Sequence, residues 1–490
     1  MSWEILQDLL TPAVLVPWML GMIFGIFVGA LPGLTATMAV ALIVPASFYL
    51  PPNAGLALII GVSFTAIFAG DIPATLLRIP GTPASAAATL DGHAMAKKGR
   101  ANHALYLDLI CSATGGLIGF LLLMTIAPQL AKFALRFSSY EYFWLAIAGL
   151  SISALVSVGN TFKGLLAAVF GMLIATVGYD IVSGMPRFSY GIQNLQSKID
   201  FIPAMIGLFG LSEVLRSFGA KEDQADKVGQ PERVRWLQLM VMFWRNKWTT
   251  LKSAVAGTFV GALPGAGADI AAWAAYGLAQ KTSKHPDEFG KGCEEGIVAP
   301  TSANNAAVAG AWIPALVFGI PGDAVTAIVL GAFTMYNIKP GPMIFEQNSA
   351  LISSLFAIGL ITQFLLLPAG WLGIKFFSRL MRLPRPYVHS GVVVFSIIGS
   401  YALHNNLFDV WVMIAFGVLG WFLEKHKVPP APLILGMILC PMIEENLRVG
   451  LIKSSGSLSP FFTNPICIVI YCGLAVSAIA PYLLRKLTGR

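Results

Sequence analysis

Charge is scarce in this sequence. Aspartate, glutamate, lysine and arginine make up 11% of the 490 residues, whereas a soluble domain carries about 25%. Hydrophobic residues make up 56% of the chain, and the mean hydropathy is +0.73. So few charges exclude a soluble enzyme carrying a membrane anchor. They predict an all-α polytopic membrane protein.

The cysteine and histidine patterns that would mark a catalytic or metal site are also missing. The five cysteines show no metal-ligand spacing and no disulfide framework, and most of them fall in apolar runs. The six histidines are scattered, and the sequence contains no P-loop or nucleophile elbow. A membrane-embedded enzyme would need a placed nucleophile and base. We therefore expect no catalytic residues, no cofactor and no metal beyond a transported sodium ion.

Glycine and proline are abundant, with 49 and 30 residues. The pentapeptide Gly-Ala-Leu-Pro-Gly occurs at 29–33 and again at 261–265, each time within an apolar stretch of membrane-spanning length. A second pair of motifs, Ile-Pro-Ala followed by Ile-Pro-Gly, occurs at 72–81 and at 313–322. Two helix-breaking motifs per half, in the same order, indicate a duplicated transporter. In such proteins, helices interrupted at matching places mark the substrate site.

The apolar segments predict two transmembrane repeats, at 1–217 and 251–450, joined by a cytoplasmic linker at 218–250. A final helix and a cytoplasmic tail follow at 451–490. Several segments are too short or too broken to cross alone, so we expect roughly 10–14 spans together with re-entrant segments.

The basic residues predict the orientation of these repeats. The net charge of +8 is spread through loops, where it sets topology and does not indicate nucleic-acid binding. The acid-free basic loop at 375–385 is expected inside, and counting crossings back from it places the loop at 339–348 outside. The equivalent loop of the first half, at 97–100, carries three basic residues and is expected inside. The two repeats are therefore expected to be inverted in the membrane.

Each pentapeptide breaks a helix and exposes backbone N–H groups at the start of the next half-helix, which suits an anion. Thr35 follows the first copy and adds a hydroxyl, whereas Asp269 follows the second. The alternative reading of each break is a packing kink. The segment 70–85 contains three prolines and predicts a re-entrant loop, within which Arg78 is a candidate carboxylate ligand. Arg78 could instead pair with Asp71 or reach the membrane interface.

The second half adds adjacent asparagines in an apolar span, whose amides need partners in a substrate, a cation or a neighbouring helix. The candidate substrate-binding residues are Gly33, Leu34, Thr35, Arg78, Gly81, Thr82, Gly265, Ala266, Asn304, Asn305 and Gly322. Candidate cation ligands are Asp71, Asp269 and Asp323, of which one or two could simply cap helices.

The chain resembles the large permease subunit of the tripartite tricarboxylate transporters, the TctA family, over nearly its whole length. The resemblance is carried by five ordered motifs: Gly29–Thr35, Ile79–Pro83, Asp91–Gly99, Asn304–Ala306 and Pro340–Pro342.

This resemblance implies an importer of tricarboxylates or related carboxylates in the bacterial inner membrane. It implies two partners, a small four-span membrane subunit and a periplasmic substrate-binding protein, and an ion gradient, of sodium or protons, as the driving force. An elevator motion is expected by analogy with similarly organised systems. The family commonly has serine in place of Asp71 and glutamate in place of Thr301. The alternative function is a passive anion channel or a permease for another organic anion, although a channel would need a continuous polar stripe.

Overall fold

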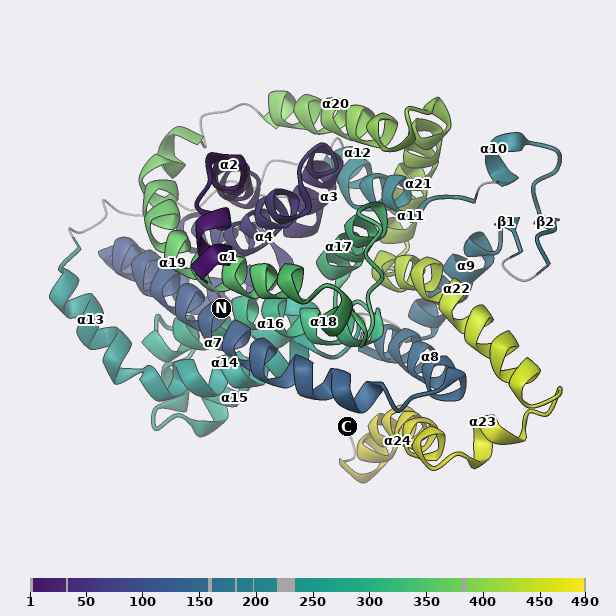
Figure 1. Ribbon diagram of the computed structural model, residues 1–490. Coiled ribbons are helices and arrows are strands. Elements are labelled where there is room, and N and C mark those ends of the chain that lie inside the picture. Colours follow the sequence, from purple (N-terminus) through teal and green to yellow (C-terminus); the bar gives the residue numbers. More distant parts are fainter. Residues whose placement is uncertain are drawn as a thin grey trace.

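The computed structural model describes residues 3–31, 34–156, 161–180, 183–196, 198–217, 234–380 and 385–488. The described chain is almost entirely helical (Figure 1). Its strands form one short antiparallel hairpin, β1 (Gly178–Tyr179) and β2 (Pro186–Arg187), in which Gly178 lies opposite Arg187. The prediction of an all-α membrane protein is confirmed.

The first half contains these helical elements, in chain order: α1 (Trp3–Leu9), α2 (Pro12–Gly29), α3 (Ala36–Ser47), α4 (Pro52–Ala69), α5 (Asp71–Leu77), η1 (Pro83–Ser85), α6 (Ala86–Met95), η2 (Ala96–Arg100), α7 (Ala101–Ala134), α8 (Ser139–Val156), α9 (Thr161–Ala175), α10 (Gln193–Gln196), α11 (Phe201–Met205), η3 (Ile206–Leu211) and α12 (Ser212–Ser217).

The second half contains the remaining helical elements: α13 (Trp236–Arg245), α14 (Lys247–Gly261), α15 (Gly267–Thr282), η4 (Pro286–Glu288), α16 (Glu294–Phe318), α17 (Ala324–Met335), α18 (Ile344–Gln347), α19 (Ser349–Leu380), α20 (Arg385–His404), α21 (Leu407–Lys425), α22 (Pro430–Lys453), α23 (Ser459–Thr463) and α24 (Pro465–Thr488).

Five helical stretches among the described residues are long and apolar enough to cross a membrane. Four shorter apolar helices, among them α3, α9 and α17, accompany them. Each pentapeptide ends a helix, since α2 stops at Gly29 and α14 stops at Gly261. The half-helices α3 and α15 then begin. The predicted breaks are therefore present in both halves.

The same glycine contacts recur in the two halves. A side chain on Gly29 would collide with the backbone of Ala66, and one on Gly261 would collide with the backbone of Ala307. These four residues occupy equivalent places in the two repeats, on α2 and α4 in the first half and on α14 and α16 in the second. Missing side chains let the paired helices approach closely at the point where each broken helix ends. The recurrence of the pentapeptide in the sequence is therefore matched by a recurrent close contact between helices.

The segment 70–85 differs from the predicted re-entrant loop. Residues 71–77 form α5, which continues directly from α4 and gives an apolar helical stretch from Pro52 to Leu77. Pro73 is tolerated because it lies in the first turn of α5, where its missing N–H is not needed by the helix. The irregular part of the segment is limited to 78–82, just before η1.

The helices form one central bundle and two flanking groups (Figure 1). Helices α2, α4, α7, α14, α16 and α19 pack together in the central bundle. The first flanking group pairs α8 and α9 with α22, and the second pairs α20 and α21 with α11, η3 and α12. Helices near the end of each half, α11 and α12 in the first and α22 in the second, thus pack against helices of the other half. In Figure 1, yellow α22 lies beside blue α8 and α9.

Candidate functional site

A cavity of about 290 Å³ lies where the central bundle meets both flanking groups. The half-helices α3, α15 and α17, which follow the broken helices, contribute their starts, and the flanking groups contribute η3, the end of α21 and the start of α22. The lining residues that bear on its chemistry are Thr35, Thr37, Thr82, Gly265, Ala266, Asp269, Asp323 and Glu424.

The three half-helices present their N-termini to this cavity with different capping. The Thr35 side chain accepts a hydrogen bond from Met38 N, which caps α3. Asp323 caps α17, because its carboxylate accepts from the N–H of Thr326 at 2.8 Å. At α15 the position before the first turn is Ala266, and no side chain caps that helix. The backbone N–H groups at the start of α15 are therefore the ones left for an anion in the cavity.

The loop at each Ile-Pro-Gly motif folds back onto the end of the broken helix and borders the cavity. Gly265 N donates a hydrogen bond to the carbonyl oxygen of Gly322 at 2.8 Å. Gly265 has φ +81°, which glycine adopts readily, and α8 approaches it so closely that a side chain would collide with Ser153. Thr82 is buried at the matching loop of the first half. The structure thus brings the predicted residues Thr35 and Thr82 and the 265–266 turn to one cavity.

Three carboxylates border the cavity, on Asp269, Asp323 and Glu424. Asp269 is exposed to it, and Asp323 is half-buried next to the α15 N-terminus. Arg216 lies 3.8 Å from the Glu424 carboxylate and also pairs with Glu213. Among the described residues that line the cavity, none is a lysine or arginine. An anion placed here would therefore meet net negative charge unless a cation or proton were bound as well.

The predicted asparagines do not line this cavity. Asn304 and Asn305 are fully buried in α16. The Asn304 side chain places Nδ2 3.4 Å from an Asp71 carboxylate oxygen, and its Oδ1 accepts from Asn305 N at 2.6 Å. These residues belong to a separate buried polar cluster that also includes Asp108 of α7. Sequence reasoning missed Asp108, although an isolated acid within the apolar run 104–111 is itself a signal for an intramembrane functional group.

The other predicted residues have different surroundings. Arg78 is exposed, adopts a left-handed conformation at the end of α5 and does not line the cavity. Its equivalent, Gly319, has the same left-handed conformation at the end of α16. Arg78 and Gly319 therefore each form the left-handed turn that ends a helix. Leu34 is buried against the core, and Gly33 lies outside the described residues.

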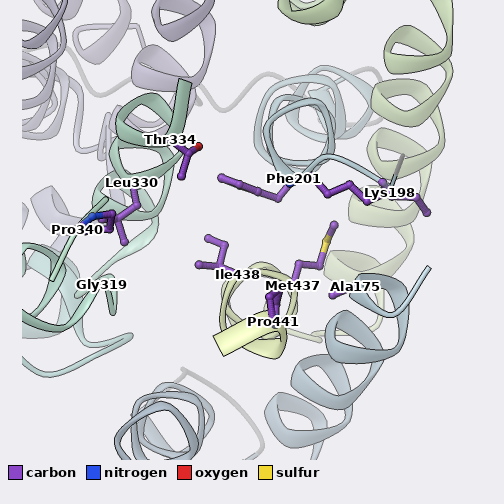
Figure 2. A pocket seen from close by; sticks show the side chains of 11 residues that line it. Ala175, Lys198, Phe201, Gly319, Leu330, Thr334, Pro340, Met437, Ile438 and Pro441 are labelled. Carbon is purple, nitrogen blue, oxygen red and sulfur yellow. The ribbon is translucent and has the colours of Figure 1, made fainter. Parts of the chain in front are cut away.

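A second cavity, of about 220 Å³, lies between α17, α11 and α22 (Figure 2). Leu330 and Thr334 of α17 lie across it from Phe201 of α11, with Ile438 of α22 near its centre. Apart from Lys198, its lining is mostly apolar. Unlike the first cavity, it gathers no half-helix N-termini. A third, polar cavity of about 200 Å³ lies beside it and shares Lys198.

Comparison with known proteins identifies the family of this chain. The profile of the "Tripartite tricarboxylate transporter TctA family" matches residues 15–435. The chain belongs to the TctA family. It is therefore a multi-pass membrane protein of a transporter family and not of an enzyme family, and its TctA membership indicates an assembly with other subunits.

Two relatives from Agrobacterium vitis show how far the similarity extends. The "Uncharacterized 52.8 kDa protein in TAR-I ttuC' 3'region" is 37% identical over 476 residues, covering 97% of this TctA chain and 94% of the relative. The "Uncharacterized protein in TAR-II ttuC' 3'region" is 40% identical over 210 residues, covering 43% of this chain and 87% of the relative. No solved structure matches the chain.

Proposed function

We propose that this TctA protein is the large permease subunit of an ion-gradient-driven importer of tricarboxylates or related carboxylates. It works in the bacterial inner membrane with a small four-span membrane subunit and a periplasmic binding protein that delivers the substrate. The observation that carries the proposal is the 290 Å³ cavity, where half-helix N-termini from both repeats converge beside threonine hydroxyls.

The cavity offers a carboxylate two kinds of donor. The uncapped N-terminus of α15 supplies backbone N–H groups and the positive end of the helix dipole. Thr37 and Thr82 supply hydroxyls, which can donate to carboxylate oxygens or accept from a substrate hydroxyl. Several separated donors suit a ligand with more than one carboxyl group.

The acidic lining supports coupling to a cation. A multiply charged carboxylate cannot stably share a confined cavity with Asp269, Asp323 and Glu424 unless positive charge enters with it. Sodium or a proton would supply that charge, so the cation gradient would drive uptake. Inverted repeats carrying matched broken helices would let the same site face either side in turn, by an elevator-type motion of the central bundle.

The test is uptake of radiolabelled citrate, and of a panel of di- and tricarboxylates, into proteoliposomes that contain all three components. Thr82→Ala should strongly reduce uptake, with a stability loss of only about 1 kcal/mol from the lost hydrogen bond to Ser85. Thr35→Ala should reduce uptake and weaken the α3 cap, whereas Thr35→Ser should retain both. The matched control is Thr125→Ala, which removes an exposed hydroxyl of α7 distant in sequence from the lining residues.

Unchanged uptake in Thr82→Ala and Thr35→Ala would reject this cavity as the substrate site. Voltage-driven anion flux through the permease alone, without the binding protein, would instead support a passive anion channel. The channel test uses a second set of vesicles that contain the permease alone.

A further inference from the structure

Two carboxyl groups lie next to each other inside the central bundle, apart from the residues that line the cavity. Asp71 begins α5 and Asp108 lies on α7, and their side chains are close enough to interact directly. Asp71 is 0% exposed and Asp108 is 2% exposed. Within the described chain, Asp71 Oδ1 and both Asp108 oxygens have no hydrogen-bond partner of good geometry.

The neighbouring hydroxyls do not satisfy these oxygens. Ser112 and Thr301 lie beside Asp108, yet Thr301 Oγ1 donates to Ile297 O at 2.8 Å and Ser112 Oγ to Thr301 O at 3.4 Å. Asn305, one helical turn beyond Thr301 on the same face of α16, is 0% exposed and has no partner for either atom of its amide among the described residues. The Asn305 amide is therefore a further buried polar group without a hydrogen-bond partner in the described part of the chain, and it lies on the face of α16 that is turned to the two carboxyl groups.

No lysine, arginine or histidine of the described chain forms an ion pair with either carboxyl group. Among the nearest elements, α4 carries no charged residue. The titratable or charged groups on the other elements packed against the pair are Arg78 just after α5, Asp91 and His93 on α6, His103, Tyr106, Cys111 and Lys132 on α7, Lys247 and Lys252 at the exposed start of α14, and Glu294 and Glu295 at the start of α16.

Charge balance limits the protonation state of Asp71 and Asp108. Two ionised carboxylates in contact, without water or a cation, repel each other and lose their hydration, which costs several kcal/mol per ion. One shared proton removes both penalties, because a protonated carboxyl can donate to its ionised partner.

Sodium fits this place less well than a proton. A sodium ion would need oxygen ligands turned toward it, but Asn304 turns its Nδ2 toward Asp71 and uses its Oδ1 to accept from Asn305 N. The Thr301 and Ser112 hydroxyls donate to backbone carbonyls and keep lone pairs, so the preference for a proton comes from the Asn304 N–H group that faces Asp71. A proton needs only the two carboxylate oxygens.

A chain of hydroxyls joins the pair to the cavity. Thr82 lines the cavity, and its Oγ1 lies 2.8 Å from Ser85 Oγ. The Ser85 side chain in turn lies next to the Asp71 carboxyl group. Hydroxyls both donate and accept, so Thr82 and Ser85 can pass a proton between the cavity and Asp71.

We propose that Asp71 and Asp108 share one proton and form the proton-binding site that couples import to a proton gradient. The inference rests on the proposed transport function. A proton from the outer solution binds one carboxylate of the pair when substrate enters. The same proton is released to the cytoplasm when the substrate is released. Only O–H bonds form and break in these two steps.

The first experiment tests the proton without requiring transport. Infrared difference spectra of the purified permease, recorded across a pH titration in H₂O and D₂O, should show a carboxylic-acid C=O band that responds to pH. The band should disappear in Asp71→Asn/Asp108→Asn and persist in Asp287→Asn, which changes an exposed aspartate. Size-exclusion elution and thermal melting confirm that each variant is folded. A band unchanged in the double variant would overturn the proposal.

The second experiment measures coupling in the three-component proteoliposomes, using a trapped pH-sensitive dye and radiolabelled citrate. The wild type should carry protons inward with citrate. Asp108→Asn and Asp71→Asn should lose proton flux and gradient-driven accumulation but keep citrate counterflow. Proton flux retained in both variants, or wild-type uptake driven by sodium alone, would overturn the inference. Absence of wild-type citrate counterflow, with the infrared band present, would count against citrate transport and not against the buried proton.

Discussion

A Cβ atom on Gly81 would lie 2.5 Å from the carbonyl oxygen of Gly29, and one on Gly322 would lie 2.6 Å from that of Gly261. In each half, the loop after the second motif therefore sits directly on the helix end made by the first. This contact places the half-helix starts around one cavity. The missing side chain of Gly81 or Gly322 permits this approach, and the missing side chain of Gly29 or Gly261 accommodates the neighbouring helix at Ala66 or Ala307.

Gly81→Ala and Gly322→Ala should each destabilise the protein, because the added methyl meets backbone atoms that cannot move independently. We expect a loss of about 1–3 kcal/mol in the free energy of unfolding, as for other overpacked sites. Thermal melting in detergent measures the effect. Gly277→Ala is the control: no atom lies within 4 Å of its added Cβ, so it should be neutral or gain up to about 1 kcal/mol. Equal melting temperatures for all three variants would contradict the close approach.

Mutations of Asp323 and Asp269, the two carboxylates beside the α15 N-terminus, should have different effects on stability and on uptake. Asp323→Ala removes a capping box and should cost about 1 kcal/mol of stability. Asp269 caps no helix, so Asp269→Asn should leave melting nearly unchanged while altering the cation dependence of uptake. Melting curves and ion-substituted uptake assays separate the two effects. A stability loss confined to Asp269→Asn would reverse these roles.

Asp91→Ala should release the loop before α16. The buried Asp91 carboxylate accepts from Tyr276 Oη at 2.9 Å and from the N–H groups of Gly290, Gly292 and Cys293 at 2.9, 2.8 and 2.7 Å. Hydrogen bonds to a charged group contribute about 1.5–3 kcal/mol each, so losing all four should cost about 3 kcal/mol or more.

Trypsin cleavage after Lys291, within this loop, gives a local readout of Asp91→Ala. Cleavage should become much faster than in the wild type. Asp287→Ala, an exposed aspartate nearby, should leave the rate unchanged. If the two variants are cleaved equally slowly, Asp91 does not hold the loop.

His404, at the turn between α20 and α21, should make stability depend on pH. Its Nδ1 lies 2.8 Å from the Asp409 carboxylate, and this hydrogen bond raises the pKa of His404 above its ordinary value of 6.5. A raised pKa in the folded state means that the pair stabilises the fold fully below pH 6.5 and loses this effect as pH rises through the raised pKa. Melting temperatures across neutral pH should show a decline that His404→Ala abolishes and exposed His285→Ala retains.

Motif periodicity and helix-breaking chemistry predicted most of the fold. Proline and glycine act on the local backbone, so the ends of α2 at Gly29 and α14 at Gly261 could be placed from sequence. Thr35, Thr82 and Ala266 all follow such breaks, and they line one cavity.

Long-range pairing was not predictable in the same way. The single acid Asp108 gives no local pattern, and its closeness to Asp71 depends on how α7 packs beside α5. Pro73 suggested an irregular loop, but one proline in a first turn leaves a helix intact. Whether Asn304 faced the cavity or Asp71 depended on the rotation of α16, which the sequence of a helix buried on all sides does not reveal.

The exchange of α11–α12 and α22 between the halves bears on how the protein is made. While the ribosome is still translating the second repeat, α8 and α9 have been synthesised but α22, the helix that packs on them, has not. Until Pro430–Lys453 has been synthesised, the faces of α8 and α9 that it covers lack this partner. The packing of the first half is therefore completed only by a helix from the second half.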